Sequence, residues 1–355
     1  MEKRIEPKKL ILPILMVILA TLLIITLALT EREDPERKTR SFYDCFDTVG
    51  TVFDYSGDST DRFSENYQLA HATLKYYHRL FDIYKSHEGV AGLYEVNRNA
   101  GVAPVKVSHE LIEFLEFCKE AYELTGGEVN IAMGSVLSLW WECREAAQIS
   151  PNSTEIPSEE ELNAASKHCD INKLIINREE STVYLEDAQM RLDVGAIGKG
   201  YAVEKAAEAL LAAGAEGYVL DVGGNIRIIG DKPSGKGFRT GIKNPFGKEG
   251  AYVKILTLSD TSTVTSGGYE RYFTVGDRRY HHIVDKDTLY PAEKFASVTV
   301  ISADSGLADA LSTALFCMDE EAGLLLIESL EEAEAVWVRL DESILCSSGI
   351  EEFDK

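Results

Sequence analysis

Residues 191–205 read Arg-Leu-Asp-Val-Gly-Ala-Ile-Gly-Lys-Gly-Tyr-Ala-Val-Glu-Lys, and they constrain the fold more than any other stretch of the 355-residue chain. A short apolar run ends at Asp193, three glycines follow within six residues, and an alanine-rich helix is expected next. Glycine lets a backbone approach a ligand closely, and the unpaired N–H groups at a helix start attract anions. With Lys199 beside them, these residues predict a cradle for a phosphate or pyrophosphate.

The turn matches neither of two familiar phosphate-binding loops. A Walker loop requires glycine where Asp193 stands, and serine or threonine where Gly200 stands. A dinucleotide-binding fingerprint requires Gly-x-Gly-x-x-Gly, whereas the order here is Gly-x-x-Gly-x-Gly. A plain strand-to-helix turn is therefore an equally good interpretation of this stretch alone, and other motifs must decide.

Composition bounds the class of protein. A hydrophobic content of 45% suffices for one large domain or two ordinary ones. The net charge of −23 disfavours nucleic-acid binding, because the phosphates would be repelled. Six cysteines occur without a Cys-x-x-Cys pair or regular spacing, which favours buried thiols over a disulfide framework or a zinc site.

The first thirty residues predict a membrane anchor. Basic residues at 3–9 precede an uncharged run, Leu10–Leu29, which as a helix would span about 30 Å, one bilayer core. Acidic residues follow, and this charge order favours an N terminus inside the cytoplasm. A cleaved signal peptide is the alternative, but 28–30 is a poor cleavage site. We expect an uncleaved signal anchor at 1–30, a single pass through the cell membrane, and an extracytoplasmic body after a linker at 31–41.

The rest of the chain predicts an α+β fold, because helical segments are segregated from short strands linked by tight turns. The body is expected at 42–345, followed by an acidic tail at 346–355. Helices are expected at 62–85, 108–125, 130–147, from 158, from the glycine-rich turn to 213, at 305–316 and at 320–330. Strands are expected within 42–55 and at 173–177, 182–186, 190–194, 217–222, 226–230, 238–243, 252–258, 271–275, 280–285, 296–302 and 335–340, and a loop at 88–101.

Two further stretches carry residue types suited to a phosphate site. Asp309 and Thr313 are four residues apart, so a helix would place them on one face, and a carboxylate with a hydroxyl suits Mg²⁺. The alternative is a helix acid and a threonine bonded to its own backbone. Gly223 and Gly224 follow an apolar strand, where they allow close approach to a ligand or simply bend the chain.

Adjacent histidines at 281 and 282 are candidates for acid–base chemistry. Neighbouring residues in a strand point to opposite faces, so His281 and His282 cannot easily bind one metal ion. One could serve as a general base while the other is structural. A structural role for both is the alternative.

Taken in order, seven stretches resemble the ApbE-type FAD:protein FMN transferases over roughly residues 42–340. They are Asp47–Thr51, Gly126–Ile131, Leu192–Ala202, Asp221–Asn225, Thr265–Tyr272, His281–Pro291 and Asp309–Thr313. The resemblance implies a single α+β domain of two lobes, related to the T-fold, with FAD between the lobes. It also implies Mg²⁺-dependent transfer of FMN from FAD to a threonine or serine of a partner protein through a phosphoester bond, with release of AMP.

The resemblance assigns the metal and proton-transfer residues. The Mg²⁺ ligands would be Asp309, Thr313 and the backbone carbonyl of Ala196. His282 matches a family histidine proposed to act in proton transfer. The catalytic residues would therefore be His282 and Asp309, although a nearby carboxylate remains an alternative base.

The resemblance also assigns the residues that contact FAD. Lys199 would lie beside the diphosphate. The other cofactor-binding positions would be Val49, Gly50, Asn130, Gly223 and Gly224. The acceptor would be an FMN-binding protein that carries an Asp-x-x-Ser/Thr-x-Ala-Thr-like motif.

Two departures from the family pattern lie near the expected flavin. Asn130 stands where many relatives carry aspartate, which removes one charge but keeps hydrogen-bonding capacity. Residues 285–291 read Asp-Lys-Asp-Thr-Leu-Tyr-Pro instead of Asp-Pro-x-Thr-Gly-x-Pro. The changes at Lys286 and Leu289 alter this turn.

Three alternative functions were weighed. An FAD pyrophosphatase would use water as nucleophile and yield free FMN and AMP. An extracytoplasmic flavin-binding protein would hold FAD without turnover, although Asp309 and Thr313 at helical spacing argue against it. The chain itself nearly carries the acceptor motif at 309–315, but Leu315 occupies the position that must supply the hydroxyl. The sequence therefore favours the transferase.

Overall fold

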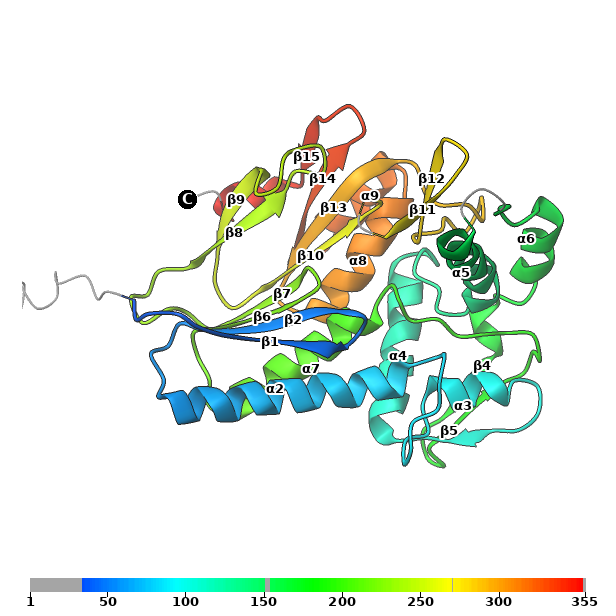
Figure 1. Ribbon diagram of the computed structural model, residues 1–355, viewed down its shortest axis with the longest axis horizontal. Coiled ribbons are helices and arrows are strands. Elements are labelled where there is room, and N and C mark those ends of the chain that lie inside the picture. The colour runs from blue at the N-terminus through cyan, green and yellow to red at the C-terminus, as the bar shows by residue number, and fades with distance from the viewer. Residues whose placement is uncertain (1–33, 151–153, 270, 354–355) are drawn as a thin grey trace, which may run out of the picture.

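The computed structural model describes residues 34–150, 154–269 and 271–353 (Figure 1). The predicted signal anchor at 1–30 lies outside these ranges. None of the helices in the described part of the chain combines the length and the apolar character needed to cross a bilayer.

The described elements follow one another with short connections. The helices are α2 (Thr60–Phe81), α3 (Leu93–Arg98), α4 (His109–Leu124), α5 (Gly134–Ile149), α6 (Glu159–Ser166), α7 (Gly198–Ala212), α8 (Ser305–Cys317) and α9 (Glu320–Glu328), with 3₁₀ helices η1 (Ile171–Lys173) and η2 (Ser348–Phe353). The strands are β1 (Lys38–Cys45), β2 (Thr48–Asp54), β3 (Val105–Lys106), β4 (Leu174–Asn177), β5 (Thr182–Leu185), β6 (Tyr218–Val222), β7 (Asn225–Ile229), β8 (Phe238–Lys243), β9 (Tyr252–Leu258), β10 (Ser262–Gly267), β11 (Tyr272–Val275), β12 (Arg278–His281), β13 (Phe295–Ser302), β14 (Ala333–Arg339) and β15 (Ile344–Cys346).

Within the described residues, eight strands form one antiparallel sheet in the order β1-β2-β6-β7-β10-β13-β14-β15. The central strand β13 is buried along nearly its whole length, because both faces of the sheet are covered. Helices α7 and α8 pack on one face, and the β8–β9 hairpin covers part of the other (Figure 1). Antiparallel pairing with segregated helices agrees with the predicted α+β class and gives a mixed α/β fold.

Helices α7 and α8 cross at Gly200. A Cβ atom at this position would overlap the carbonyl oxygen of Ser305 and the Cβ of Asp309, so only glycine permits the close approach. Helix α2 packs on the outer side of α7 (Figure 1). The crossing therefore places the start of α7 directly beside the face of α8 that carries Asp309.

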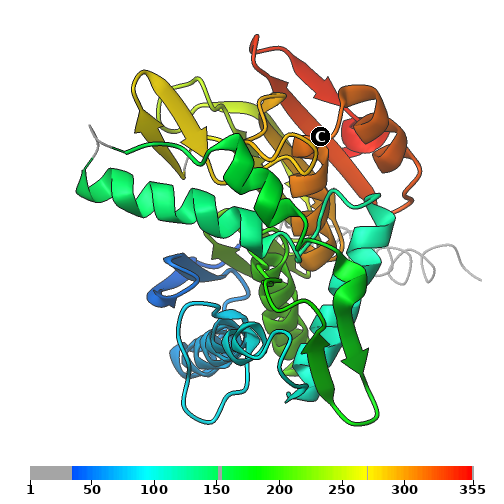
Figure 2. The same ribbon diagram turned by 90° about the vertical axis from the view of Figure 1, so that its right-hand side faces the viewer.

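A second group of elements faces this helix pair. Helix α5 packs on the β11–β12 hairpin, where Trp140 stacks on Tyr280 with ring centroids 5.6 Å apart. Figure 2 shows α5 (green) below that hairpin (yellow) and above the β1–β2 turn (blue). The space between α5, the hairpin and the α7–α8 crossing is the site described below.

Most predicted elements are present, with shifted ends. The predicted N-caps are confirmed: Ser108 accepts from Leu111 N–H, and Ser158 forms the predicted capping box with Glu161. Helix α5 begins at Gly134 rather than at 130, and α3 lies within the expected loop at 88–101.

Three predicted assignments were wrong. Residues 190–194 form one isolated bridge rather than a strand, because Leu192 and Asp193 donate to Asn97 and the Ile131 carbonyl. Strand β1 occupies the end of the expected linker. The expected acidic tail instead forms part of β15 and all of η2, where Ile350 is only 1% exposed.

Two strands escaped prediction. The sequence of β10 is Ser-Thr-Val-Thr-Ser-Gly, whose small hydroxylated side chains lack the apolar pattern of a central strand. Strand β15 has only three residues. The predicted strand 280–285 ends at His281, so His282 lies just beyond β12.

Candidate active site

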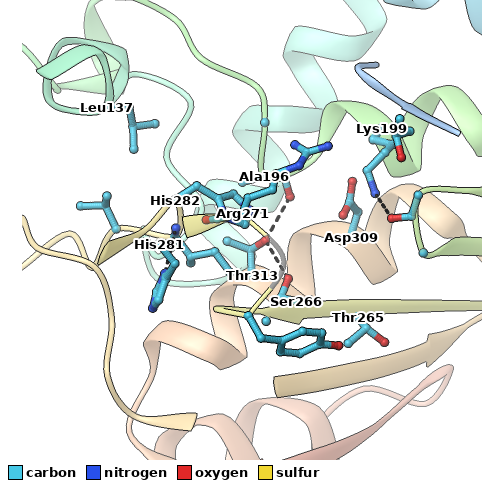
Figure 3. A pocket seen from close by; sticks show the side chains of 18 of the residues that line it. Leu137, Ala196, Lys199, Thr265, Ser266, Arg271, His281, His282, Asp309 and Thr313 are labelled. Atoms are coloured by element: carbon cyan, nitrogen blue, oxygen red, sulfur yellow. Dashed lines mark hydrogen bonds between the residues drawn. The ribbon is translucent and has the colours of Figure 1, made fainter. Parts of the chain in front are cut away.

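One cleft gathers most of the residues singled out from the sequence. Its volume is about 580 Å³, within the range of small-molecule sites, ~300–1,000 Å³. Its walls come from the β1–β2 turn, the loop before α5, the glycine-rich turn before α7, the β6–β7 turn, β8, β10, the β11–β12 hairpin and α8 (Figure 3). Eight segments far apart in the chain thus meet at one place.

Three oxygen-bearing groups converge on one wall. The hydroxyl of Thr313 lies 3.4 Å from the carbonyl oxygen of Ala196, to which it donates. Asp309, one helical turn before Thr313, lines the same cleft and is only 6% exposed. The Ser266 hydroxyl lies 3.3 Å from that of Thr313. We call Ala196 O, Asp309 and Thr313 the oxygen cluster.

The carboxylate of Asp309 is held by the crossing of the two helices. Its Oδ2 accepts a 2.7 Å hydrogen bond from Gly200 N–H in the first turn of α7. Burial raises the pKa of Asp309, while the charge of Lys199 and the Gly200 N–H oppose this rise. A carboxylate that is buried at such a cost is stabilised by a cation beside it.

The two glycine-rich turns are joined by Lys199. Its amine donates to the Gly223 carbonyl at 3.3 Å and to the side-chain oxygen of Asn225. Both Gly223 and Gly224 have positive φ angles, 56° and 88°, in the tight turn between β6 and β7. Gly223 packs against Thr48, whereas a Cβ on Gly224 would meet nothing within 4 Å. The backbone at Gly224 is therefore open to a ligand.

The structure does not bring Val49 and Gly50 to the cleft wall. Both lie inside β2, where Gly50 packs against the Phe42 ring. The Val49 carbonyl accepts from Gly223 N–H at 3.1 Å and so supports the β6–β7 turn from behind. The cleft is lined by Asp47 and Thr48 instead, because β2 begins at Thr48 and the turn before it projects toward the site.

Asn130 lines the cleft, but its amide is used to shape the chain. Its Nδ2 donates to the Cys169 carbonyl and its Oδ1 accepts from Ala132 N–H, both at 2.9 Å. Two residues earlier, the Glu128 carboxylate also lines the cleft and lies 3.4 Å from the Lys286 amine. Burial raises the pKa of Glu128, and Lys286 opposes that rise.

The second departure in the 285–291 turn also has a structural counterpart. Leu289, where the family pattern has glycine, adopts a positive φ of 62°. Its carbonyl accepts a 2.9 Å hydrogen bond from the indole N–H of Trp140. The turn therefore keeps a glycine-like conformation and is tied to α5.

The two histidines have different partners. His281 Nε2 lies 2.7 Å from the Ala292 carbonyl, and its Nδ1 accepts from Ile283 N–H, so both ring nitrogens are used by the backbone. His282 Nδ1 lies 3.3 Å from the Arg271 carbonyl. A carbonyl only accepts, so Nδ1 carries the proton and Nε2 keeps its lone pair. His282 faces the cleft and is the histidine suited to accept a proton.

The electrostatic surroundings keep His282 neutral. The cleft walls exclude bulk water around the ring although the ring itself is accessible from the cleft. This desolvation, followed by the charge of Arg271, lowers the pKa of His282 to about 4. At neutral pH the ring is therefore an unprotonated base.

Several cleft residues were not assigned a role from the sequence. Arg271 lay inside a quoted motif, but nothing in the pattern indicated that its side chain would reach the cleft. Lys243, at the end of β8, lies 4.9 Å from the Tyr269 ring centroid. Tyr84 and Trp141 form an aromatic pair with centroids 5.2 Å apart. Their convergence depends on tertiary packing, so no local pattern signals it.

Two other groups of potential metal ligands occur among the described residues, at 44, 45 and 71 and at 78, 82 and 87. Asp44 is already paired with Lys75 and His71. In the second group, His78 Nδ1 accepts from Phe46 N–H, which leaves its other ring nitrogen protonated in the neutral form. Both groups are explained as structural contacts.

Comparison with known proteins identifies the family. A model of the ApbE family matches residues 49–337. The chain belongs to the ApbE family. The FAD:protein FMN transferase of Treponema pallidum (strain Nichols) is 33% identical over 274 residues, which cover 73% of this chain and 74% of that protein. The FAD:protein FMN transferase of Klebsiella pneumoniae (strain 342) is 29% identical over 287 residues, with coverage of 81% and 87%.

Solved ApbE structures share the fold. The ApbE protein from Thermotoga maritima matches with a TM-score of 0.79 at 27% identity, over 90% of this chain and 100% of that one. The flavin transferase ApbE from Vibrio cholerae matches with a TM-score of 0.72 at 25% identity, over 90% and 99%. The likeness therefore extends over almost all of the described residues.

Proposed function

We propose that this protein transfers the FMN part of FAD to a threonine or serine hydroxyl of an acceptor protein and releases AMP. The observation that carries the proposal is the meeting of the oxygen cluster, Lys199 and a neutral His282 in one cleft. The names of the similar proteins, FAD:protein FMN transferase, support the same reaction.

The oxygen cluster fits a hard divalent cation such as Mg²⁺. Its donors are a carboxylate, a hydroxyl and a backbone carbonyl, with no nitrogen or sulfur among them. Asp309, Thr313 and Ala196 O would hold the ion, and the burial of Asp309 favours a positive charge at this place. When bound, the ion would neutralise charge on the diphosphate of FAD.

The chain's own residues supply the remaining anion binding. Lys199 places a positive charge beside the open backbone of Gly224, at the first turn of α7. The positive end of that helix dipole points in the same direction. An acidic protein thus offers the diphosphate a locally positive site, and FAD is bound as a substrate.

His282 is assigned as the general base. The acceptor hydroxyl oxygen forms a bond to the FMN-side phosphorus, and the bond from that phosphorus to the bridging oxygen breaks. The electron pair of the broken bond leaves on the phosphate of AMP, and the hydroxyl proton passes to His282 Nε2. The Nδ1–H···O contact to the Arg271 carbonyl keeps Nε2 turned to the substrate.

The acceptor and the cellular location follow from the sequence hypotheses. We assign the acceptor as an FMN-binding protein with an Asp-x-x-Ser/Thr-x-Ala-Thr-like motif in the same compartment. The segment 1–30 would anchor the enzyme to the cell membrane by a single pass, with the catalytic domain extracytoplasmic. The high negative charge gives nucleic acid no role.

One assay tests the function against its alternatives. The full chain in detergent is incubated with FAD, Mg²⁺ and an acceptor domain that carries the motif, with a Thr→Val acceptor as the control. In-gel flavin fluorescence on the intact acceptor alone, together with AMP, supports the transferase. AMP with only free FMN would support a pyrophosphatase, and bound FAD without AMP would support a flavin-binding protein.

A further inference from the structure

Arg271 is a cleft residue whose role the proposed function does not yet use. It stands immediately before β11 and lines the cleft with His282 and the oxygen cluster. Among the described residues, no carboxylate forms an ion pair with its guanidinium group. Its charge acts on both His282 and Asp309, which shows that the guanidinium lies near each of them. A cation without an acidic partner in a cleft is a site for an anion.

Figure 3 shows Arg271 and Lys199 on either side of Asp309, with His282 beyond Arg271. The amine of Lys199 is directed to the β6–β7 turn, at the far side of the cleft from the histidine. A phosphoryl group at the oxygen cluster would therefore have one cation on each flank. The flank with Arg271 is the one from which His282 can deprotonate an incoming hydroxyl.

We propose that Arg271 is a catalytic residue that binds the phosphoryl oxygens of the FMN-side phosphate through its guanidinium group and positions His282 through its backbone carbonyl. This inference rests on the proposed function and adds the residue that holds the transferred group on the side of attack. Arg271 itself neither gains nor loses a proton while the oxygen–phosphorus bond to the acceptor forms and the bond to AMP breaks.

The chemistry of phosphoryl transfer explains why arginine suits this place. The nucleophile and the leaving group are in line with the phosphorus, so the negative charge is spread over the remaining oxygens around it. A guanidinium group presents a planar pair of N–H donors that matches two phosphoryl oxygens, which an ammonium group cannot do. The geometry therefore favours a bidentate contact on the FMN-side phosphate.

The backbone of the same residue couples substrate binding to the base. The Arg271 carbonyl is the partner of His282 Nδ1, at 3.3 Å. A phosphate that fixes the Arg271 side chain also fixes this carbonyl, and thereby the direction of the Nε2 lone pair. Arg271 thus links the position of the phosphate to the orientation of the histidine that takes the proton.

The test compares Arg271→Ala and Arg271→Lys with Arg278→Ala in the full chain. Arg278 lies in the same hairpin but does not line the cleft, and it pairs with Glu293 at 2.8 Å on the surface. Loss of one transition-state donor costs about 10²–10³ in rate, so Arg271→Ala should lower kcat/KM for acceptor labelling by about 100-fold or more. Arg271→Lys should recover part of this loss, and Arg278→Ala should stay within about twofold of wild type.

Two readouts separate phosphate binding from a purely structural role. Wild type should bind FMN more tightly than riboflavin, and Arg271→Ala should lose affinity for FMN while its affinity for riboflavin stays unchanged. Added guanidinium ion should restore part of the Arg271→Ala rate. The acid limb of its pH profile should also move to higher pH, because His281 and Arg144 alone would then oppose protonation of His282.

The outcomes decide the inference and the proposed function separately. Equal FMN and riboflavin preferences in wild type and Arg271→Ala, with labelling within about twofold, would overturn the role of Arg271. A wild-type chain that binds FMN through Arg271 but neither labels the acceptor nor releases AMP would overturn the proposed function and leave the phosphate contact supported.

Discussion

The two ends of the cleft are built in different ways. The oxygen cluster stands on the crossing of α7 and α8, where Asp309 is buried and held by the Gly200 N–H. His282 and Arg271 stand beyond strand ends beside the β11–β12 hairpin, and the His282 ring is open to the cleft. The phosphate end is therefore fixed by the core, whereas the proton-transfer end is set by loop contacts that can adjust to an acceptor.

The largest expected effect is at the fixed end. Asp309→Ala removes the carboxylate of the oxygen cluster, so AMP release at moderate Mg²⁺ should fall by at least about 10³-fold, as expected when a charged transition-state contact is lost. Riboflavin binding should persist, because Asp309 does not contact the ring system in this scheme. Undiminished turnover would remove Asp309 from the metal site.

The histidines test the adjustable end. His282→Gln should lower kcat by about 10²–10⁴, the usual contribution of a general base, whereas His281→Gln should chiefly lower thermal stability. The pKa of His282 is depressed to about 4, so the wild-type base is neutral at higher pH and activity should fall only as pH approaches that value. A pH–rate profile of each variant checks this, and equal losses in both variants would contradict the distinction.

Gly200→Ala tests whether the fixed end depends on the core. The added methyl group overlaps the Ser305 carbonyl, and overpacking of this kind costs about 1–3 kcal/mol of unfolding free energy. Glu208→Ala, exposed on the same helix, should change stability by no more than about 0.5 kcal/mol. Denaturant titration measures both, and a Gly200→Ala protein as stable as wild type would show that the crossing can relax.

The smallest expected effect concerns the Glu128–Lys286 pair, which bridges the loop before α5 and the 285–291 turn. Both side chains are partly exposed, so Lys286→Ala should raise the KM for FAD by only about two- to fivefold, the effect of a weak ion pair. Asp287→Asn, on the exposed side of Lys286, is the matched control. A change in kcat without a change in KM would place the pair in the chemical step instead.

Local patterns predicted the fixed end better than the adjustable one. Helical spacing alone places Asp309 and Thr313 on one face, and apolar strands and capping serines gave most element positions. The approach of Ala196 to Thr313 was implied only by the family resemblance, because it depends on helices that are distant in sequence. The direction of the histidines depended on where β12 ends, which a two-residue period cannot specify.

The misplaced flavin contacts have a similar cause. Val49 and Gly50 belong to a motif that reaches the cleft, but sheet pairing turns them away and leaves Asp47 and Thr48 at the wall. A one-residue shift in a strand exchanges its faces, so a motif match cannot say which of its residues point inward. Arg271 illustrates the converse, since its role depends on tertiary neighbours rather than on its motif.

The hydrogen bond between Gly200 and Asp309 also bears on how the protein matures, because it joins positions 109 residues apart in the chain. Strands β6 to β13 are all synthesised between these two residues, and closing so long a loop is slow until their pairing shortens it. Competence should therefore arrive late, with the docking of α8, and translation products that stop before residue 305 should have no latent activity toward FAD.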